Sequence, residues 1–207
     1  DDTGEIFWMD QGGFEAALVD LTNPDAAAWL QGVIEELIGT GVRGWMADFS
    51  EGLPLNVELH DGQAETEHNR WPEYWAQINE GALASTGTLA DSLVFHRSGN
   101  QRSPGHARAF WLGDQLVTWD GYDGLATVVP GLLSSGLSGY TIQHADTGGY
   151  LSVNALGIVR DGELFRRWVE LNAFTPLLRM HSTNQPEDNH QWDTDPETIE
   201  HLAQMAG

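Results

Sequence analysis

The chain has 207 residues, of which 9 are Lys or Arg and 31 are Asp or Glu, so its formal charge is −22 with His neutral. Every basic residue is Arg, and this excess of negative charge argues against nucleic acids and anionic membranes as partners. The absence of Cys excludes disulfides, thiol catalysis and Cys-ligated zinc. A hydrophobic content of 41% is sufficient for a folded core and argues against a disordered acidic tail.

The acidity has two interpretations. It is either an ordinary solvated surface or an adaptation to high ionic strength, where salt screens repulsion between surface carboxylates. The sequence opens with Asp1-Asp2, without a basic start and apolar stretch, so a secretory signal is not expected here. Position 1 is not Met, which indicates that the natural start lies upstream, and no apolar run is long enough to span a bilayer.

The first strongly periodic segment predicts a helix over 24–40. Asn23 is a suitable N-cap, and Pro24 occupies the first helical position. One predicted face carries the apolar side chains of Trp29, Leu30, Val33, Ile34, Leu37 and Ile38. Gly39 and Gly41 are expected to end this helix.

Strands and helices alternate along the rest of the chain. In chain order we predict a strand at 42–49, a helix at 71–86, strands at 93–96 and 109–112, a helix at 122–137 weakened by Pro130, a strand at 140–144, a helix at 160–178, a polar irregular stretch at 182–196 and a helix at 196–205. This alternation predicts an α/β fold built from right-handed βαβ units around a parallel sheet.

Polar residues follow each predicted strand. The strands lead in turn into Asp48 and Glu51, His96-Arg97-Ser98, Asp114-Gln115, and finally His144 with Asp146. A charge directly after a buried strand is costly unless it is paired or used, and parallel α/β folds collect their chemistry at the carboxyl ends of strands. The pattern therefore favours an active-site rim, with ordinary loop starts as the alternative.

Two carboxylates at such a rim suit glycoside hydrolysis. In that chemistry one carboxylate stays ionised and the other is held protonated, and a separation of about 5–5.5 Å gives a retaining reaction. The nine Trp residues are compatible with a sugar site because aromatic rings stack on sugar faces, although most buried Trp residues are simply core.

Six segments resemble glycoside hydrolase family 31, the retaining α-glucosidase family. In family order they are Asp20-Leu21-Thr22-Asn23-Pro24, Trp45-Met46-Ala47-Asp48-Phe49-Ser50-Glu51, Arg97-Ser98, Trp111-Leu112-Gly113-Asp114-Gln115, His144-Ala145-Asp146-Thr147-Gly148-Gly149-Tyr150 and Phe174-Thr175-Pro176-Leu177-Leu178-Arg179-Met180-His181. Each segment is weak alone, but together they span nearly the whole chain.

The resemblance implies roles for individual residues. Asp48 would be the nucleophile and Asp114 the general acid/base, with no metal or organic cofactor. Arg97, Asp146 and His181 would hold sugar hydroxyls. The pocket would be walled by Trp45 and Trp111, with Glu51 one layer behind the substrate contacts.

A finer resemblance is to the sulfoquinovosidase branch, which removes α-linked sulfoquinovose from the glycerol part of plant sulfolipid. Ala47-Asp48-Phe49, Gln115, His68-Asn69 with Trp71-Pro72, and Gly148-Gly149-Tyr150 all look like that branch. In the branch the Tyr150 hydroxyl would help to bind the sulfonate, as a phenol donor suits an anion. The other sulfonate ligands of the branch, a Gln, an Arg and a Trp, lie upstream of the matched stretch.

Family members are several hundred residues long, with a (β/α)8 TIM barrel between β domains. The resemblance implies that residues 1–207 form one partial barrel domain, approximately its strands 4–7, without the N-terminal β-sandwich, the early strands and the C-terminal region. Such a piece exposes sheet edges, so as an isolated chain it is expected to be weakly stable and poorly active. The resemblance and the lack of Cys indicate a cytoplasmic protein, while the oligomeric state stays open.

The leading interpretation is a retaining exo-α-glycosidase acting on a small-molecule glycoside, most simply a sulfoquinovoside. Alternatives are an α-glucosidase or α-xylosidase acting on neutral sugars, and a non-catalytic carbohydrate-binding barrel. A metal site is a further alternative, and its ligands would be His144, Asp146, His181, Asp188 and His190.

Overall fold

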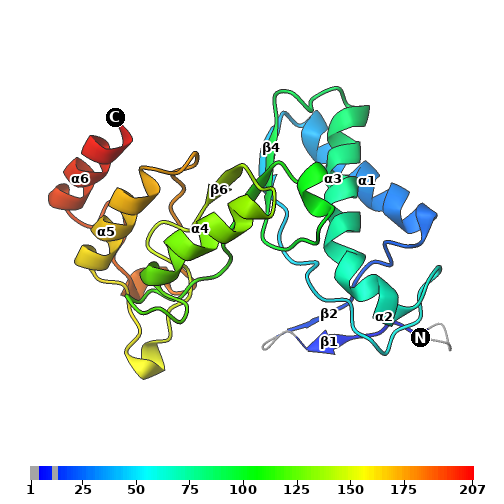
Figure 1. Ribbon diagram of the computed structural model, residues 1–207, viewed down its shortest axis with the longest axis horizontal. Helices are drawn as coiled ribbons and strands as arrows, with labels where there is room; N and C mark the ends of the chain where they lie inside the picture. The colour runs from blue at the N-terminus through cyan, green and yellow to red at the C-terminus, as the bar shows by residue number, and fades with distance from the viewer. Residues whose placement is uncertain (1–4, 11–13) are drawn as a thin grey trace. The chain divides into compact units, whose positions relative to one another are not determined.

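The computed structural model describes residues 5–10 and 14–207, which form two compact units, 1–108 and 109–207 (Figure 1). Each unit contributes one pair of parallel strands with flanking helices. Within the described residues, no helix is long and apolar enough to cross a membrane. The predicted parallel α/β organisation is confirmed, whereas the numbering of these strands within a barrel stays a prediction.

The first unit begins with a short antiparallel pair, β1 (Met9–Asp10) and β2 (Glu15–Ala16), which was not predicted. The elements that follow are α1 (Pro24–Gly39), β3 (Gly44–Met46), α2 (Ala64–Glu67), a 3₁₀ turn (His68–Arg70), α3 (Trp71–Ser85) and β4 (Leu93–His96). β3 and β4 run parallel, with Gly44 opposite Leu93 and Met46 opposite Phe95. A 3₁₀ turn at Ser103–Gly105 follows β4.

Helix α1 begins as its sequence predicts. The Asn23 side chain accepts hydrogen bonds from the backbone N–H groups of Asp25 and Ala26, so it satisfies two of the unpaired donors at the helix start. Only part of the predicted apolar face is covered. Ile34 and Ile38 are buried, but Trp29, Val33 and Leu37 are exposed.

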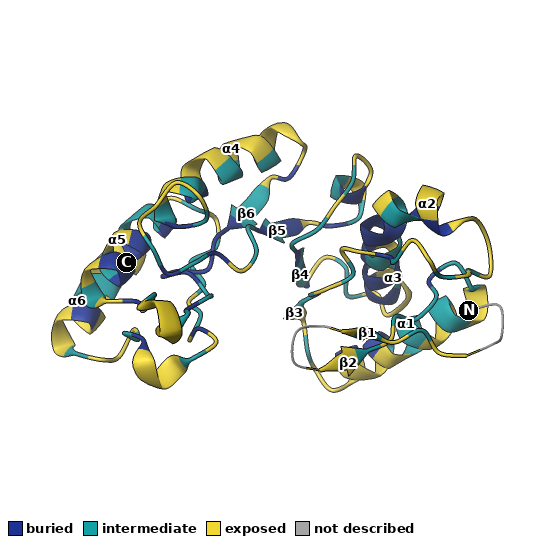
Figure 2. Cartoon of the chain, turned by 90° about the horizontal axis from the view of Figure 1, so that it is seen from below, coloured by how far each residue is buried: buried dark blue, intermediate teal, exposed yellow. Residues whose placement is uncertain are grey.

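The core of the first unit lies where α1 packs on α3 (Figure 1). α3 is the more buried helix and appears mostly dark blue in Figure 2. Pro72 sits in its first turn, where a missing N–H costs no helical bond. The buried cluster contains Leu21, Ile34, Ile38, Ala47, Leu53, Ala64, Trp71, Ile78, Ala82, Leu83 and Val94.

The second unit consists of β5 (Ala109–Trp111), a 3₁₀ turn (Leu125–Thr127), α4 (Val128–Leu137), β6 (Ile142–His144), a 3₁₀ turn (Asn154–Leu156), α5 (Gly162–Asn172), a 3₁₀ turn (Pro186–Asp188) and α6 (Pro196–Ala206). β5 and β6 run parallel, and Trp111 lies opposite His144. A further parallel bridge joins Thr147 to Met180, beyond the end of β6.

Two predicted helices are shorter in the structure. The 122–137 segment becomes helical only from 125, and α4 proper starts two residues before Pro130, which is tolerated because it stays in the first turn. α5 ends at Asn172 rather than 178. There the Asn172 amide turns inward to the Ala145 carbonyl, and Thr175 is disfavoured in a helix because Pro176 follows it.

α5 carries the core of the second unit. The Asp161 side chain caps the helix by accepting from the Leu164 N–H, and the helix buries its own Leu164, Trp168 and Val169 side chains. α6 packs on α5 (Figure 1). This packing anchors the chain that runs from β6 into α5, which carries several predicted site residues.

Candidate active site

Asp48 lies two residues after the end of β3 and is half-buried. Its Oδ1 accepts a hydrogen bond from the Phe49 N–H at 2.7 Å, and the same oxygen lies 2.9 Å from Arg97 Nε. Arg97 also pairs with Glu51. In the part of the chain that the structure describes, both contacts of this carboxylate fall on Oδ1. These two contacts hold the orientation of the Asp48 side chain through that oxygen.

The backbone after Asp48 turns sharply. Phe49 has φ +60° and Ser50 has φ +63°, so two consecutive residues other than glycine occupy the left-handed region. Such a conformation costs of order 1 kcal/mol or more per residue and persists where surrounding contacts hold it. The Arg97 guanidinium lies 5.2 Å from the centroid of the Phe49 ring, which provides one of those contacts.

Arg97 reaches Asp48 because β4 lies beside β3. The Ala47 N–H donates to the Phe95 carbonyl at 2.9 Å, which aligns the ends of both strands. His96 is buried at the end of β4, and this burial lowers its pKa to about 4. Trp45 is half-buried, and its indole N–H donates to Asn79 Oδ1 at 2.8 Å.

In the second unit, Asp114 lies on an exposed turn after β5. Gly113 supplies the turn with φ +83°, a region that glycine enters without strain. The following residue, Gln115, is buried, and its carbonyl accepts from the N–H groups of Tyr150 and Leu151 at 2.8 and 3.0 Å. The turn that carries Asp114 is thus hydrogen-bonded to the segment that carries Tyr150. Trp111 is fully buried in β5.

Asp146 is buried and paired with Arg179. The same guanidinium donates from Nε to His144 Nε2 at 3.0 Å. Because Nε2 accepts, the hydrogen of the neutral ring sits on Nδ1. Burial first and the Arg179 charge second lower the pKa of His144 to about 4, so the imidazole stays neutral near pH 7.

Tyr150 and His181 lie against each other, with ring centroids 4.7 Å apart and planes at 73°. The backbone N–H of Thr183 donates to His181 Nδ1 at 3.0 Å. In the neutral ring this bond places the hydrogen on Nε2. A phenol and an imidazole N–H thus meet at one place in this unit.

Two arginines of this unit were not assigned by sequence reasoning. Arg179 lies inside a recognised motif, but its bonds to His144 and Asp146 were not predicted. Arg160 is 2% exposed and donates to the carbonyls of Gly149, His181 and His190. Arg179 could have been found from the sequence because it lies in one of the family segments. Arg160 lies in none of them, and nothing in its local sequence distinguishes it from an exposed arginine.

The metal-site alternative has no support in the geometry. Among the residues that the structure describes, no three His, Asp or Glu side chains gather where they could hold a metal ion. His144 and Asp146 both face Arg179, a cation, which is the opposite of a metal-binding environment.

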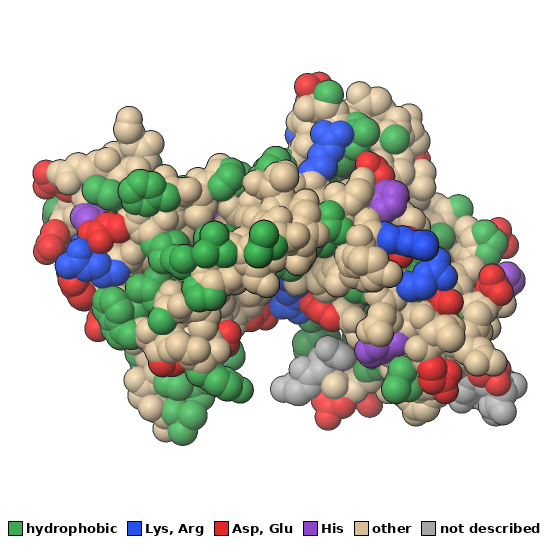
Figure 3. Space-filling model, viewed as in Figure 1, with side chains coloured by type: hydrophobic (Ala, Val, Ile, Leu, Met, Phe, Trp, Pro, Cys, Tyr) green, Lys and Arg blue, Asp and Glu red, His purple; other side chains and the backbone are tan. Residues whose placement is uncertain are grey.

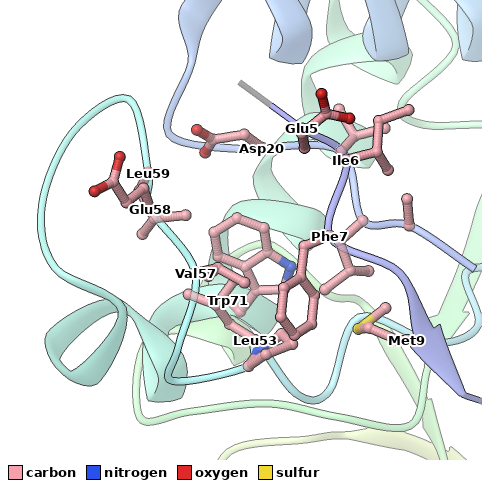
Figure 4. A pocket seen from close by; sticks show the side chains of 14 residues that line it. Glu5, Ile6, Phe7, Met9, Asp20, Leu53, Val57, Glu58, Leu59 and Trp71 are labelled. Atoms are coloured by element: carbon pink, nitrogen blue, oxygen red, sulfur yellow. The ribbon is translucent and has the colours of Figure 1, made fainter. Parts of the chain in front are cut away.

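The first unit also holds an apolar pocket of about 370 Å³ beside the β1–β2 pair (Figure 4). Phe7, Met9, Leu53, Val57 and Trp71 are among its lining residues, and the Glu58 carboxylate points away from them. None of the sequence-predicted site residues lines this pocket. Glu5 and Asp20 also line the pocket, and apart from these two residues and Glu58 its lining is apolar.

The predicted site residues therefore form two groups. Asp48, Glu51 and Arg97 are linked at the end of β3 and β4, with Trp45 nearby on β3. The other group is the Arg179–Asp146 pair and the Tyr150–His181 pair, with Asp114 on the turn bonded to them through Gln115. Asp48 and Asp114 belong to different units, so the predicted separation of their carboxylates stays a prediction.

Comparisons with known proteins identify the family. Residues 1–206 match the glycosyl hydrolases family 31 TIM-barrel domain. The chain belongs to glycosyl hydrolase family 31. The predicted resemblance is thereby confirmed.

Within family 31 the chain is similar to sulfoquinovosidases. It is 45% identical to the sulfoquinovosidase of Escherichia coli K12 over 99% of this chain and 30% of that protein. Its identity to the Agrobacterium fabrum sulfoquinovosidase is 43%, over 98% of this chain and 31% of that protein. The chain thus spans about a third of the length of these relatives.

Solved structures agree. A family 31 sulfoquinovosidase from E. rectale, in complex with the aza-sugar inhibitor IFGSQ, matches with a TM-score of 0.95 and 41% identity over 99% of this chain and 31% of that one. A family 31 dextranase from Flavobacterium johnsoniae matches with a TM-score of 0.78 at 22% identity, over 99% of this chain and 26% of that one, which shows the shared fold.

Proposed function

We propose that this family 31 chain carries the nucleophile and the general acid/base of a retaining exo-α-glycosidase. The observation that supports it best is the fixed Asp48 carboxylate. Arg97 and the Phe49 N–H both bind Oδ1, so Oδ2 is the oxygen that would attack an anomeric carbon. A carboxylate held this way is oriented before substrate arrives.

The reaction takes place in two steps. In the first, Asp114 donates its proton to the glycosidic oxygen as the bond to the anomeric carbon breaks, and Asp48 Oδ2 forms a bond to that carbon. The alcohol leaves and a β-glycosyl ester remains. In the second, Asp114 takes a proton from water, the water oxygen bonds to the anomeric carbon, and the Asp48 carboxylate is released with an α product.

The proposed substrate class is an α-sulfoquinovoside. Its support is the 41–45% identity to three sulfoquinovosidases and the presence of Tyr150, whose phenol suits an anionic group, beside His181, which the resemblance places at the sugar hydroxyls. A second candidate is an α-xyloside, because an Emericella nidulans α-xylosidase is 30% identical over 87% of this chain.

Hydrolysis of chromogenic substrates by the intact protein tests the substrate class. The 4-nitrophenyl α-sulfoquinovoside should exceed the α-glucoside and α-xyloside in kcat/KM by at least about tenfold. A preference for a neutral sugar would overturn the sulfosugar assignment and leave the glycosidase. Binding of all three without turnover would favour a non-catalytic barrel.

Azide distinguishes the roles of the two carboxylates. In Asp48→Gly, azide replaces the nucleophile and should yield a β-glycosyl azide with 4-nitrophenolate as the departing group. In Asp114→Ala, azide attacks the glycosyl ester in place of activated water and should yield an α-glycosyl azide. The same product from both variants would contradict the assignment, and Asp91→Asn, an exposed acid with no predicted role, is the matched control.

A further inference from the structure

Arg160 is a buried charge in an unusual setting. The residue is 2% exposed, and in the described part of the chain no carboxylate lies within ion-pair distance of its guanidinium. A buried cation is costly unless its donors are satisfied. The groups that bind the Arg160 guanidinium therefore indicate its role.

The donors of Arg160 are satisfied mainly by backbone carbonyls. Nε donates to the His190 carbonyl at 2.8 Å, and Nη1 donates to the carbonyls of His181 at 3.0 Å and Gly149 at 3.3 Å. Nη2 donates to Gln191 Oε1 at 3.2 Å. One rigid planar group therefore connects three segments that are separate in the sequence.

Two of these segments carry the pair of rings described above. Gly149 immediately precedes Tyr150, and the carbonyl of His181 itself accepts the second bond, so one nitrogen of Arg160 lies between the backbones of both ring residues. The fit is tight on this side. A Cβ at Gly148 would lie 2.6 Å from Arg160 Nη1, so only glycine leaves room for the guanidinium.

We propose that Arg160 is the positioning residue for the anion-binding Tyr150: it fixes the spacing of Tyr150 and His181 through their backbones and adds a positive charge close to both. The inference rests on the proposed sulfosugar function. It assigns to Arg160 a part of the protein's selectivity for sulfonated over neutral sugars. Arg160 would not touch the substrate. Its charge persists at neutral pH, since burial lowers its pKa only to about 10.

Steady-state kinetics of the intact protein test the assignment. Arg160→Gln should raise KM for 4-nitrophenyl α-sulfoquinovoside by about tenfold or more, with a smaller change in kcat and in the KM of the α-glucoside. Arg160→Lys should recover part of the loss because it restores the charge without the fork of donors. Arg167→Gln, an exposed arginine on α5, is the matched control and should leave both substrates unchanged.

A double-mutant cycle separates positioning from general stability. In a Tyr150→Phe background, Arg160→Lys should change selectivity by less than it does in the wild-type protein, because the two residues act on the same group. Equal loss on sulfonated and neutral substrates, or full additivity with Tyr150→Phe, would overturn the inference. Should the Arg160 variants not fold, Gln191→Leu removes one acceptor of the guanidinium, and an unchanged selectivity in that folded variant would also overturn it.

Failure of this inference is distinguishable from failure of the proposed function. If the wild-type protein hydrolyses the sulfoquinovoside and the Arg160 variants keep its selectivity, the function stands and the inference is wrong. If the wild-type protein prefers neutral sugars, the function is wrong as well, and Arg160 has no anion to position.

Discussion

The Nε atom of Arg97 lies 2.9 Å from Oδ1 of Asp48, and the same guanidinium pairs with Glu51. This one arginine thus holds the carboxylate after β3 and the residue three positions beyond it. Its side chain is 17% exposed, so the contact is partly shielded from water and from salt.

Replacing Arg97 by Lys should lower kcat for any substrate of the intact protein by roughly a hundredfold, because a small displacement of a reacting group has effects of this size. A lysine keeps the charge but cannot bind Asp48 and Glu51 with one planar group. Initial rates with a 4-nitrophenyl glycoside measure the effect. Arg102→Lys, at an arginine side chain that is 66% exposed, is the control, and equal rates in both variants would contradict the role of Arg97.

Acid should destabilise the protein between pH 6.5 and pH 4. His96 and His144 both have folded pKa values of about 4 against an ordinary value of 6.5. Between these pH values the unfolded chain binds protons at His96 and His144 that the folded chain does not bind. The contribution of the two neutral imidazoles to the free energy of unfolding is therefore full above pH 6.5 and is lost as the pH falls toward 4. The total loss should be a few kcal/mol.

Urea midpoints at pH 7.5 and pH 4.5 measure this loss. His144→Gln should have a smaller difference between the two midpoints than the wild-type protein, because one of the two titrating groups is gone. A midpoint that does not change with pH in the wild-type protein would contradict the burial of neutral imidazoles.

Gly148→Ala should destabilise the protein by about 3 kcal/mol, because a methyl group there is strained at positive φ and overlaps buried atoms. Gly148 has φ +94°, and its Cβ would lie 2.6 Å from Arg160 Nη1 and 2.8 Å from the Phe165 ring. Gly157→Ala is the control, since Gly157 has φ +69° with no atom within 4 Å of its Cβ. It should cost about 1 kcal/mol from backbone strain alone. Equal melting temperatures for the two variants would contradict the prediction, because they would show that Arg160 and Phe165 can move aside at little cost.

Salt should stabilise the protein. The formal charge of −22 produces repulsion between surface carboxylates that ions screen. Most of the few basic side chains already pair with acidic ones, as Arg167 does with Glu163 and Glu170, and Figure 3 shows the same mixture on one face. The melting temperature should rise from 50 mM to 2 M KCl, on the order of several degrees, and a fall would favour an ordinary solvated surface.

The sequence predicted those features that depend on local signals. α1 starts where Asn23 and Pro24 indicate, and the polar residues after β3 and β4 meet because parallel strands end at the same edge. The roles of Arg160 and Arg179 depend instead on acceptors distant in sequence, many of them backbone carbonyls, which no residue pattern reveals. The exposure of Trp29 cannot be read from the sequence, because periodicity marks an apolar face without showing which part of it is covered.

The turn at Phe49 and Ser50 restricts how the protein can be altered. Valine, isoleucine and threonine strongly resist left-handed backbone, so a mutational library at these two positions would lose most such variants to misfolding. Asparagine, aspartate and glycine are the substitutions that the backbone would accept. The side chain of Phe49 is exposed to solvent, but its backbone conformation suits few residue types. The range of residues found at position 49 should therefore be smaller than the exposure of the side chain alone would suggest.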